Sequence, residues 1–392
     1  MDTSELRELL TPEALGLLEQ LPPSEGAPDA VRLVSRLRKE GHPPARVAAV
    51  LTQYRLRRKA VAKFGPFAER MLFTAPGLEQ ASRLAVAAQH AGRYRAAGLG
   101  SVADLGCGIG GDSMAFSALD LRVTAVERDE PTAAIASYNL APWVRTTVEL
   151  GDATGFDVER AEGLWLDPAR REGARRLSSP DDFSPRLEAA LALAAQRPTG
   201  IKLAPGMDRA LLPEGLEAQW VSDGGEVVEL VLWSGALARD GIGRAALVLG
   251  AEGSSELTAP EDSADAPVGD PGEYLYEPDG AVIRARLIGD LARRLDGRML
   301  DGTIAWITAD RLQPTPFARA FRVLERWPLD AKRIGRELKQ RGIGTVEIKK
   351  RGVDIDPAAF RKQLKPTGAG SATLVLTRVA GERAALLVER CD

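Results

Sequence analysis

The sequence predicts an α/β fold in which a mainly parallel β-sheet is covered by helices on both faces. Between residues 101 and 250, short runs of strand-forming residues alternate with helical segments, and this alternation is typical of a parallel sheet. A glycine cluster follows the first run and precedes a helix, as in loops that bind nucleotide-type cofactors. The expected strands are 101–105, 122–127, 145–150, 162–167, 199–203, 226–233 and 244–249, with helices at about 111–119, 130–140 and 184–196.

Length and composition set the outer limits. A chain of 392 residues exceeds one typical domain and suggests two or three. The apolar content of 44% and charged content of 27% are ordinary for a soluble globular protein. Two cysteines in unrelated contexts and two histidines predict neither a disulfide framework nor a metal site. We expect no signal peptide and no membrane span, and therefore a cytoplasmic protein.

The chain divides by composition into four parts. Residues 1–95 carry leucine and valine at helical spacing and predict a helical N-terminal segment. Residues 96–250 form the predicted α/β domain. Residues 251–279 contain nine acidic residues and no lysine or arginine among Ser, Pro and Gly, which predicts an acidic linker. Residues 280–392 predict a small α+β domain that ends in a hairpin.

The C-terminal part is locally basic. Between residues 332 and 365, eleven lysines and arginines stand against four acids, although the whole chain has a net charge of −3. This asymmetry favours a polyanionic partner, and an ordinary solvated surface remains the alternative. The same two readings apply to a basic cluster at residues 55–63. We expect Lys349, Lys350 and Arg351 to contact a nucleic acid substrate.

The glycine loop fits two cofactor templates. Gly106, Gly108 and Gly111 match the dinucleotide pattern G-x-G-x-x-G. Gly106, Gly108 and Gly110, preceded by Asp104, instead match D-x-G-x-G-x-G. A carboxylate beside the loop suits a cofactor that carries an ammonium and a sulfonium better than one that carries a pyrophosphate. Either pattern alone is weak, and a tight turn without a ligand also stays open.

Acidic residues then follow successive strands, at Glu127, at Asp152 and at Asp167-Pro168. In this order, residues 70–250 resemble the class I S-adenosylmethionine-dependent methyltransferases, whereas a dinucleotide domain leaves the third and fourth sites unexplained. The resemblance implies a Rossmann-like sheet of seven strands whose last two, 226–233 and 244–249, form an antiparallel hairpin. It also implies that S-adenosylmethionine is held by Thr74, Asp104, Gly106, Gly108, Gly110, Glu127 (ribose), Asp152 and Ala153 (adenine).

Within that class, residues 104–116 and 135–140 are most similar to the RNA guanine-N2 methyltransferases and the trimethylguanosine synthase group. Residues 341–352 and 372–378 resemble a THUMP-like domain, a type of domain that binds RNA. The resemblance implies an enzyme that methylates an exocyclic amino group, guanine N2, of a structured RNA such as tRNA or rRNA.

The fourth motif departs from the pattern [DN]-P-P-[YFW] of enzymes that methylate base amino groups. Asp167 and Pro168 can still orient an amino group, whereas Arg170 replaces the aromatic residue and is expected to contact base or phosphate. The motif is also similar to the Asp-Pro-Pro-Arg of uracil-C5 enzymes, which need a cysteine where this chain has Lys202-Leu203-Ala204-Pro205. A methyltransferase for a protein or small molecule, and a non-catalytic protein that binds the cofactor or RNA, remain alternatives.

Overall fold

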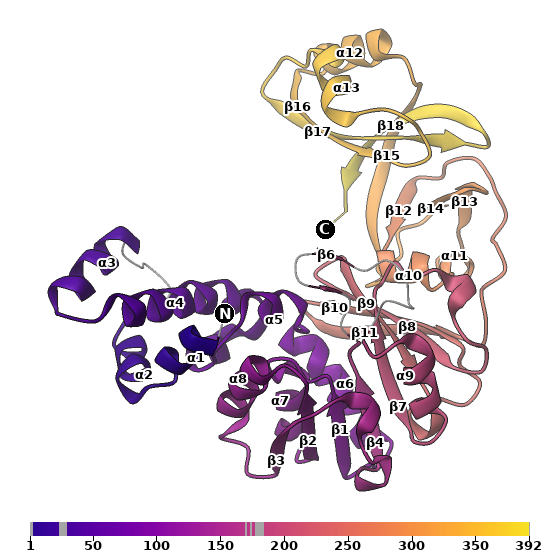
Figure 1. Cartoon of the computed structure of the whole chain (residues 1–392). Helices are drawn as coiled ribbons and strands as arrows, with labels where there is room; N and C mark the ends of the chain where they lie inside the picture. The colour runs from indigo at the N-terminus through magenta and orange to yellow at the C-terminus, as the bar shows by residue number, and fades with distance from the viewer. Residues whose placement is uncertain (1–2, 23–29, 169–170, 173–174, 177–183, 392) are drawn as a thin grey trace. The chain divides into compact units, whose positions relative to one another are not determined.

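The computed structural model describes residues 3–22, 30–168, 171–172, 175–176 and 184–391 (Figure 1). The chain forms two compact units. The first contains residues 1–203 and 231–239, and the second contains residues 204–230 and 240–392. The boundary between the units falls inside the predicted α/β domain of residues 96–250. The chain leaves the first unit after residue 203 and returns to it for residues 231–239.

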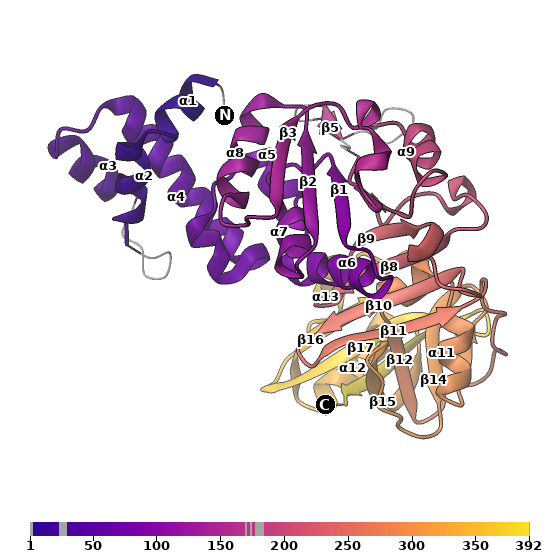
Figure 2. The ribbon, with the colours of Figure 1, turned by 90° about the horizontal axis from the view of Figure 1, so that it is seen from below.

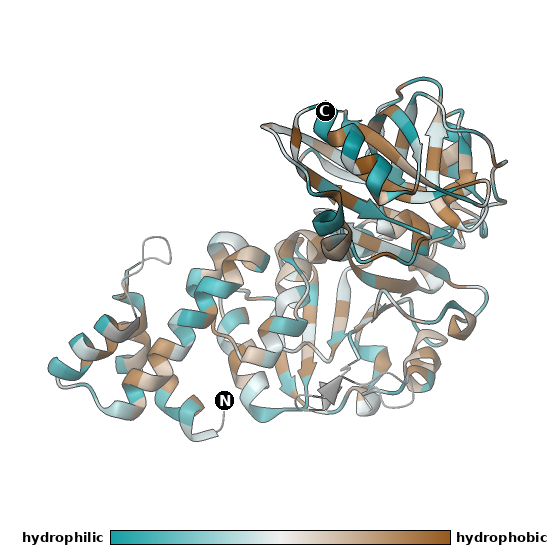
Figure 3. Cartoon of the chain, turned by 90° about the horizontal axis from the view of Figure 1, so that it is seen from above, coloured by the Kyte–Doolittle hydropathy of each residue, from teal (hydrophilic) through white to brown (hydrophobic). Residues whose placement is uncertain are grey.

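The first unit begins with helices, as its leucine spacing predicts. Thr11 accepts a hydrogen bond from the Ala14 N–H and Pro12 occupies the first helical turn, so the second helix has both features of a stable start. Brown and teal residues alternate along these helices, as in amphipathic helices (Figure 3). The helices are α1 (Thr3–Leu9), α2 (Pro12–Glu19), α3 (Ala30–Lys39), α4 (Pro44–Phe64), α5 (Ala75–Gln80) and α6 (Leu84–Ala96).

A parallel sheet follows, in the order β7-β4-β1-β2-β3, and Figure 2 labels its neighbouring strands β1, β2 and β3. Its strands are β1 (Ser101–Leu105), β2 (Arg122–Glu127), β3 (Thr146–Leu150), β4 (Gly163–Leu166) and β7 (Thr199–Leu203). Leu105 pairs with Val126 and with Leu166, so the carboxyl ends of the central strands lie at one edge. The connecting helices are α7 (Gly111–Ala118), α8 (Glu130–Leu140) and α9 (Leu187–Ala194). These elements confirm the predicted strand and helix alternation.

The expected hairpin between 226–233 and 244–249 is wrong. Strand β10 (Arg244–Gly250) pairs in parallel with β8 (Glu217–Asp223) and antiparallel with β11 (Gly253–Ala259). Strand β9 (Glu226–Trp233) instead follows β8 across Gly224-Gly225, where both residues have positive φ, as a two-residue hairpin turn requires. Strand β8 escapes the sequence pattern because three of its buried residues, Glu217, Gln219 and Ser222, are polar.

The segment expected as an acidic linker also forms strands. Residues 251–279 contain β11 and β12 (Tyr274–Pro278), and Leu257 and Leu275 are fully buried. One of the acids is neutralised in place, since Asp262 accepts hydrogen bonds from Arg209 and Arg244. Of the nine acids in this segment only Glu256 and Glu277 lie in the two strands, so the acidic composition reflects the turns and connections around ordered strands.

The rest of the second unit is a sheet in the order β13-β14-β12-β15-β18-β17-β16. Two helices, α12 and α13, bury Ile334, Leu338, Phe360 and Leu364 in one core with side chains of the sheet. The predicted hairpin over residues 372–389 is present as β17 and β18. The elements are β13 (Arg298–Asp301), β14 (Ile304–Ala309), β15 (Ala318–Pro328), β16 (Ile343–Lys350), β17 (Gly370–Val379), β18 (Glu382–Arg390), α10 (Gly280–Arg284), α11 (Ile288–Arg294), α12 (Ala331–Gln340) and α13 (Pro357–Leu364).

Candidate cofactor and methyl-transfer site

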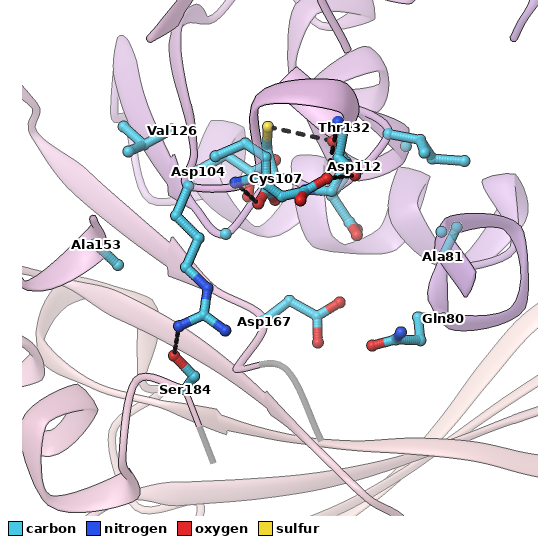
Figure 4. Close-up of a pocket in the computed structure, with 18 of the residues that line it drawn as sticks. Gln80, Ala81, Asp104, Cys107, Asp112, Val126, Thr132, Ala153, Asp167 and Ser184 are labelled. Carbon is cyan, nitrogen blue, oxygen red and sulfur yellow. Dashed lines mark hydrogen bonds between the residues drawn. The ribbon is translucent and has the colours of Figure 1, made fainter. Parts of the chain in front are cut away.

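A cavity of roughly 370 Å³ lies in the first unit at the carboxyl edge of the parallel sheet. Open α/β sheets bind their ligands at this edge. Figure 4 shows Asp167 projecting into the space, with Asp104, Cys107 and Asp112 on one side and Ser184 on another. Of the predicted site residues, the structure brings together Thr74, Asp104, Gly106, Gly108, Glu127, Asp152, Ala153 and Asp167 along its wall.

The glycine loop is held against the end of β2. The N–H groups of Gly106 and Cys107 both donate to the Val126 carbonyl, at 2.9 and 3.0 Å. Gly106 has φ 94°, and a Cβ there would lie 3.3 Å from the Asp167 carbonyl. Gly110, with φ 87°, caps the N-terminus of α7 and would bring a Cβ within 3.0 Å of Leu140. Side chains at these two positions would strain the loop that forms the cavity floor.

Glu127 joins this loop to the turn after β2. One carboxylate oxygen accepts from the Gly108 N–H at 3.0 Å, and the other accepts from the Asp129 N–H at 2.9 Å. A carboxylate oxygen has room for a further donor, so a Glu127 fixed in this way can also accept from hydroxyl groups in the cavity. Asp152 is arranged differently, because it caps a short turn by accepting from the Thr154 N–H at 2.8 Å. Its hydrogen bonds from Thr154 hold the pKa of Asp152 below its ordinary value.

Asp104 is a buried carboxylate with one oxygen in use. Asp104 is 1% exposed, and its Oδ2 accepts a hydrogen bond from Ser113 Oγ at 2.6 Å. Oδ1 has no hydrogen-bond partner among the described residues. Burial, and next the charge of Asp112, raise the pKa of Asp104 well above its ordinary value. An ammonium group placed in the cavity would satisfy this oxygen, and the residues present therefore fit S-adenosylmethionine.

The extended segment that carries Thr74 is held through its backbone. Gln53 exchanges two hydrogen bonds with Phe73, at 2.8 and 2.9 Å, and Arg57 Nε donates to the Met71 carbonyl at 2.9 Å. Asn139 exchanges two with Leu72, at 2.8 and 2.9 Å, and donates a third to the Ile109 carbonyl of the glycine loop. The sequence predicted no role for these side chains of α4 and α8. Arg57 belongs to the basic cluster at residues 55–63, which was expected to be a solvated or phosphate-binding face, but Arg57 is buried.

At the end of β4, Asp167 forms an ion pair that the sequence analysis missed. Asp167 Oδ2 lies 2.6 Å from Lys202 Nζ, and the two side chains are 22% and 4% exposed. Pro168 is buried, whereas Arg170, the third predicted catalytic residue, lies outside the described residues. Arg128 also lines the cavity and donates to Ser184 Oγ at 2.6 Å, and Ser184 is labelled in Figure 4.

The predicted substrate residues lie in the second unit and differ in exposure. Lys349 Nζ is 2.8 Å from Glu277, and Arg351 donates to the Ala305 carbonyl at 2.9 Å. Burial lowers the pKa of Arg351, whose guanidinium lies 5.6 Å from the centre of the Trp306 ring. Lys350 is exposed. Several further exposed cations of this unit lie on and beside α12 and α13, at Lys332, Arg333, Arg336, Lys339, Lys362 and Lys365.

The described part of the chain contains no group of His, Cys, Asp or Glu side chains that could hold a metal ion. Within the described residues, no helix has the length and apolar character that a membrane span requires.

The fold and the cavity together define a methyltransferase that uses S-adenosylmethionine.

Comparison with known proteins agrees with this class. The chain is 34% identical over 335 residues to uncharacterized S-adenosylmethionine-dependent methyltransferases of two Mycobacterium tuberculosis strains, covering 83% of this chain and 90% of each relative. It belongs to this family of S-adenosylmethionine-dependent methyltransferases. Residues 318–390 match the THUMP domain-like family, and residues 2–60 match a domain of unknown function, DUF8688.

A solved structure shows the same fold over the whole length. It is a protein from Porphyromonas gingivalis W83 that is provisionally assigned as a methyltransferase. The two chains superpose with a TM-score of 0.74 over 100% of this chain and 99% of the other, at 22% sequence identity.

Proposed function

We propose that this methyltransferase modifies an exocyclic amino group, guanine N2, of a structured RNA. The observation that carries the proposal is the position of Asp167, whose carboxylate lines the same cavity as the glycine loop, Glu127 and Asp152. A hydrogen-bond acceptor at this place can hold the N–H of an amino group so that its lone pair faces the methyl donor. Such a reaction depends mainly on alignment in a site shielded from water.

The residues of the chain have separate tasks in this scheme. Asp104 would hold the ammonium of S-adenosylmethionine, and Glu127 and Asp152 would hold its ribose and adenine. When bound, the cofactor supplies an electrophilic methyl group; the C–S electron pair stays with sulfur as the N–C bond forms. Asp167 would accept an N–H of the amino group, and we assign to its carboxylate the proton that the methylated nitrogen must lose. The Pro168 carbonyl and Arg170 are the further groups we assign to the base.

The second unit supplies the basis for choosing RNA. The residues that match the THUMP domain-like family include α12, which exposes Lys332, Arg333, Arg336 and Lys339 to solvent. Cations on one helix face are suited to a phosphate backbone. We infer that tRNA or rRNA is the substrate, and that the reaction takes place in the cytoplasm. Lys350 would add a contact, whereas the ion pair of Lys349 and the burial of Arg351 give these two a weaker claim.

The experiment measures tritium transfer from labelled S-adenosylmethionine to bulk tRNA and rRNA from cells that lack the protein. Label in one pool, released by nuclease digestion as N2-methylguanosine, is the expected result. Asp167→Ala should abolish the transfer while the affinity for the cofactor changes little. No label in either pool, with cofactor binding intact in a parallel titration, would overturn the proposal and favour a protein or small-molecule substrate.

A further inference from the structure

Lys202 is a buried cation near the end of β7, in a strand whose five residues are all buried. Its Nζ donates to Asp167 Oδ2 at 2.6 Å, to Ser82 Oγ at 3.0 Å and to the Gln80 carbonyl at 3.3 Å. A lysine ammonium has three N–H groups, so these three acceptors fit the charged form. Burial of a charge is costly unless the charge is paired, so the contacts with these acceptors explain how the strand accommodates a cation.

The contact continues from Lys202 to a second carboxylate. Ser82 Oγ donates to Asp112 Oδ2 at 2.9 Å, and His90 Nδ1 lies 2.8 Å from Asp112 Oδ1. Burial opposes ionisation of Asp112, but the hydrogen bond and charge of His90, followed by Lys202 and Ser82, bring the pKa of Asp112 below its ordinary value. Lys202 thus lies between two carboxylates, one on α7 and one at the end of β4.

We propose that Lys202 is the positioning residue that holds Asp167 in its working orientation; this inference rests on the proposed amino-group substrate. The ammonium occupies Oδ2 and fixes the carboxylate plane. Among the described residues no donor contacts Oδ1, which leaves that oxygen to accept the N–H of the substrate. A carboxylate without Lys202 could rotate, and both oxygens would then compete for the same donor.

Lys202 also offsets the negative charge of the cavity wall. Asp104 and Asp112 lie on the same wall as Asp167, and carboxylates that share a site compete for ionisation. Lys63 is a second cation in this region: burial, and next the charge of Lys202, lower the pKa of Lys63 to about 8. Loss of Lys202 would therefore remove the ion-pair partner of Asp167 and leave Asp167 beside two acids in the cavity.

The test is a double-mutant cycle on Asp167→Asn and Lys202→Met, assayed with tritiated S-adenosylmethionine and the RNA pool that wild type labels. Each single substitution should lower kcat by about 100-fold, as misplacement of a reacting group does. The double variant should be no slower than the slower single variant, because Lys202 acts through Asp167. Affinity for the cofactor, measured by calorimetry, should change less than about threefold. A kcat within threefold of wild type in Lys202→Met, or losses that multiply in the double variant, would overturn the inference.

Ser82→Ala is the matched control. It removes one acceptor of Lys202 and the link to Asp112 but keeps the ion pair with Asp167, so kcat should stay within about threefold of wild type. A loss equal to that of Lys202→Met would assign the effect to packing of the network and overturn the inference. The double variant removes both charges together, which is tolerated better than leaving one buried charge unpaired. Lys202→Gln replaces Lys202→Met if the latter does not fold.

A second measurement needs no substrate. A crystal structure of Lys202→Met, compared with one of wild type, should show the Asp167 carboxylate turned away from the orientation that the ion pair holds. An Asp167 carboxylate that keeps its wild-type orientation in Lys202→Met would overturn the inference. If wild type labels no RNA, the proposed function fails, and this comparison of the two structures still decides the role of Lys202.

Discussion

The Asn139 side chain closes a two-way hydrogen bond with the backbone of Leu72, accepting from its N–H at 2.8 Å and donating to its carbonyl at 2.9 Å. A third bond runs from Asn139 to the Ile109 carbonyl in the glycine loop. One side chain on α8 therefore sets the spacing between two walls of the cofactor cavity that lie more than thirty residues apart in sequence.

We predict that Asn139→Ala lowers the free energy of unfolding by roughly 2 to 4 kcal/mol, because it leaves buried backbone groups of Leu72 without partners. The affinity for S-adenosylmethionine should fall with it. Chemical denaturation and calorimetry give the two quantities. Ser137→Ala, two residues earlier in α8, removes only a bond to the Ala133 carbonyl within that helix and should cost less than about 1 kcal/mol. Equal losses in both variants would contradict the role given to Asn139.

At a pH between the ordinary value of 3.8 and the raised folded-state pKa, binding of S-adenosylmethionine should release a proton from Asp104. Its folded-state pKa is raised, so the contribution of this carboxyl to stability is lost as pH rises from the unfolded value of 3.8 toward the folded pKa. An ammonium beside Oδ1 would reverse this by favouring the ionised form. Calorimetry in buffers of different ionisation enthalpy should show the release in wild type and its absence in Asp104→Asn. A binding enthalpy that is independent of buffer would refute the pairing.

Lys63 should make stability depend on pH above neutrality. Its Nζ donates to the carbonyls of Leu78, Glu79 and Ala81, and its folded pKa is about 8 against 10.5 in the ordinary state. Between these values the unfolded chain binds more protons than the folded chain, so the free energy of unfolding rises with pH relative to Lys63→Met. Denaturation at pH 7, 8.5 and 10 measures the slope. Lys59→Met, an exposed neighbour on α4, should keep the slope of wild type.

Glu127→Gln should weaken binding of S-adenosylmethionine by about 10- to 100-fold, since hydrogen bonds to a charged group contribute about 1.5 to 3 kcal/mol. The amide NH₂ would also face the N–H of either Gly108 or Asp129, each of which now donates a hydrogen bond to the carboxylate. Isothermal titration measures the affinity. Glu130→Gln, exposed at the start of α8, is the control and should bind as wild type does.

The sequence predicted the parts of the site that lie at strand ends. Asp104, Glu127, Asp152 and Asp167 each follow or end a recognisable apolar run, and parallel strands bring their carboxyl ends to one edge. Each was therefore placed by a local pattern, and the topology then assembled them around one cavity.

The missed residues have no local pattern. Gln53 contacts Phe73 at 20 residues' separation and Asn139 contacts Leu72 at 67, so only the folded chain shows the pairing. Lys202 interrupts an apolar strand in the sequence and is explained by Asp167, 35 residues earlier. The error over the hairpin has the same origin, because β8 buries polar side chains that hide its apolar period.

The hydrogen bonds from α4 to the backbone of residues 71–73 limit where this enzyme can be truncated. Gln53 and Arg57 lie inside the stretch that matches DUF8688, yet their bonds end on Met71 and Phe73, in the segment that carries the cavity-lining Thr74. A fragment trimmed to the sheet-bearing portion would lose those anchors while keeping every motif residue. A catalytically competent fragment of this enzyme must therefore include α4 in addition to the sheet that carries the motif residues.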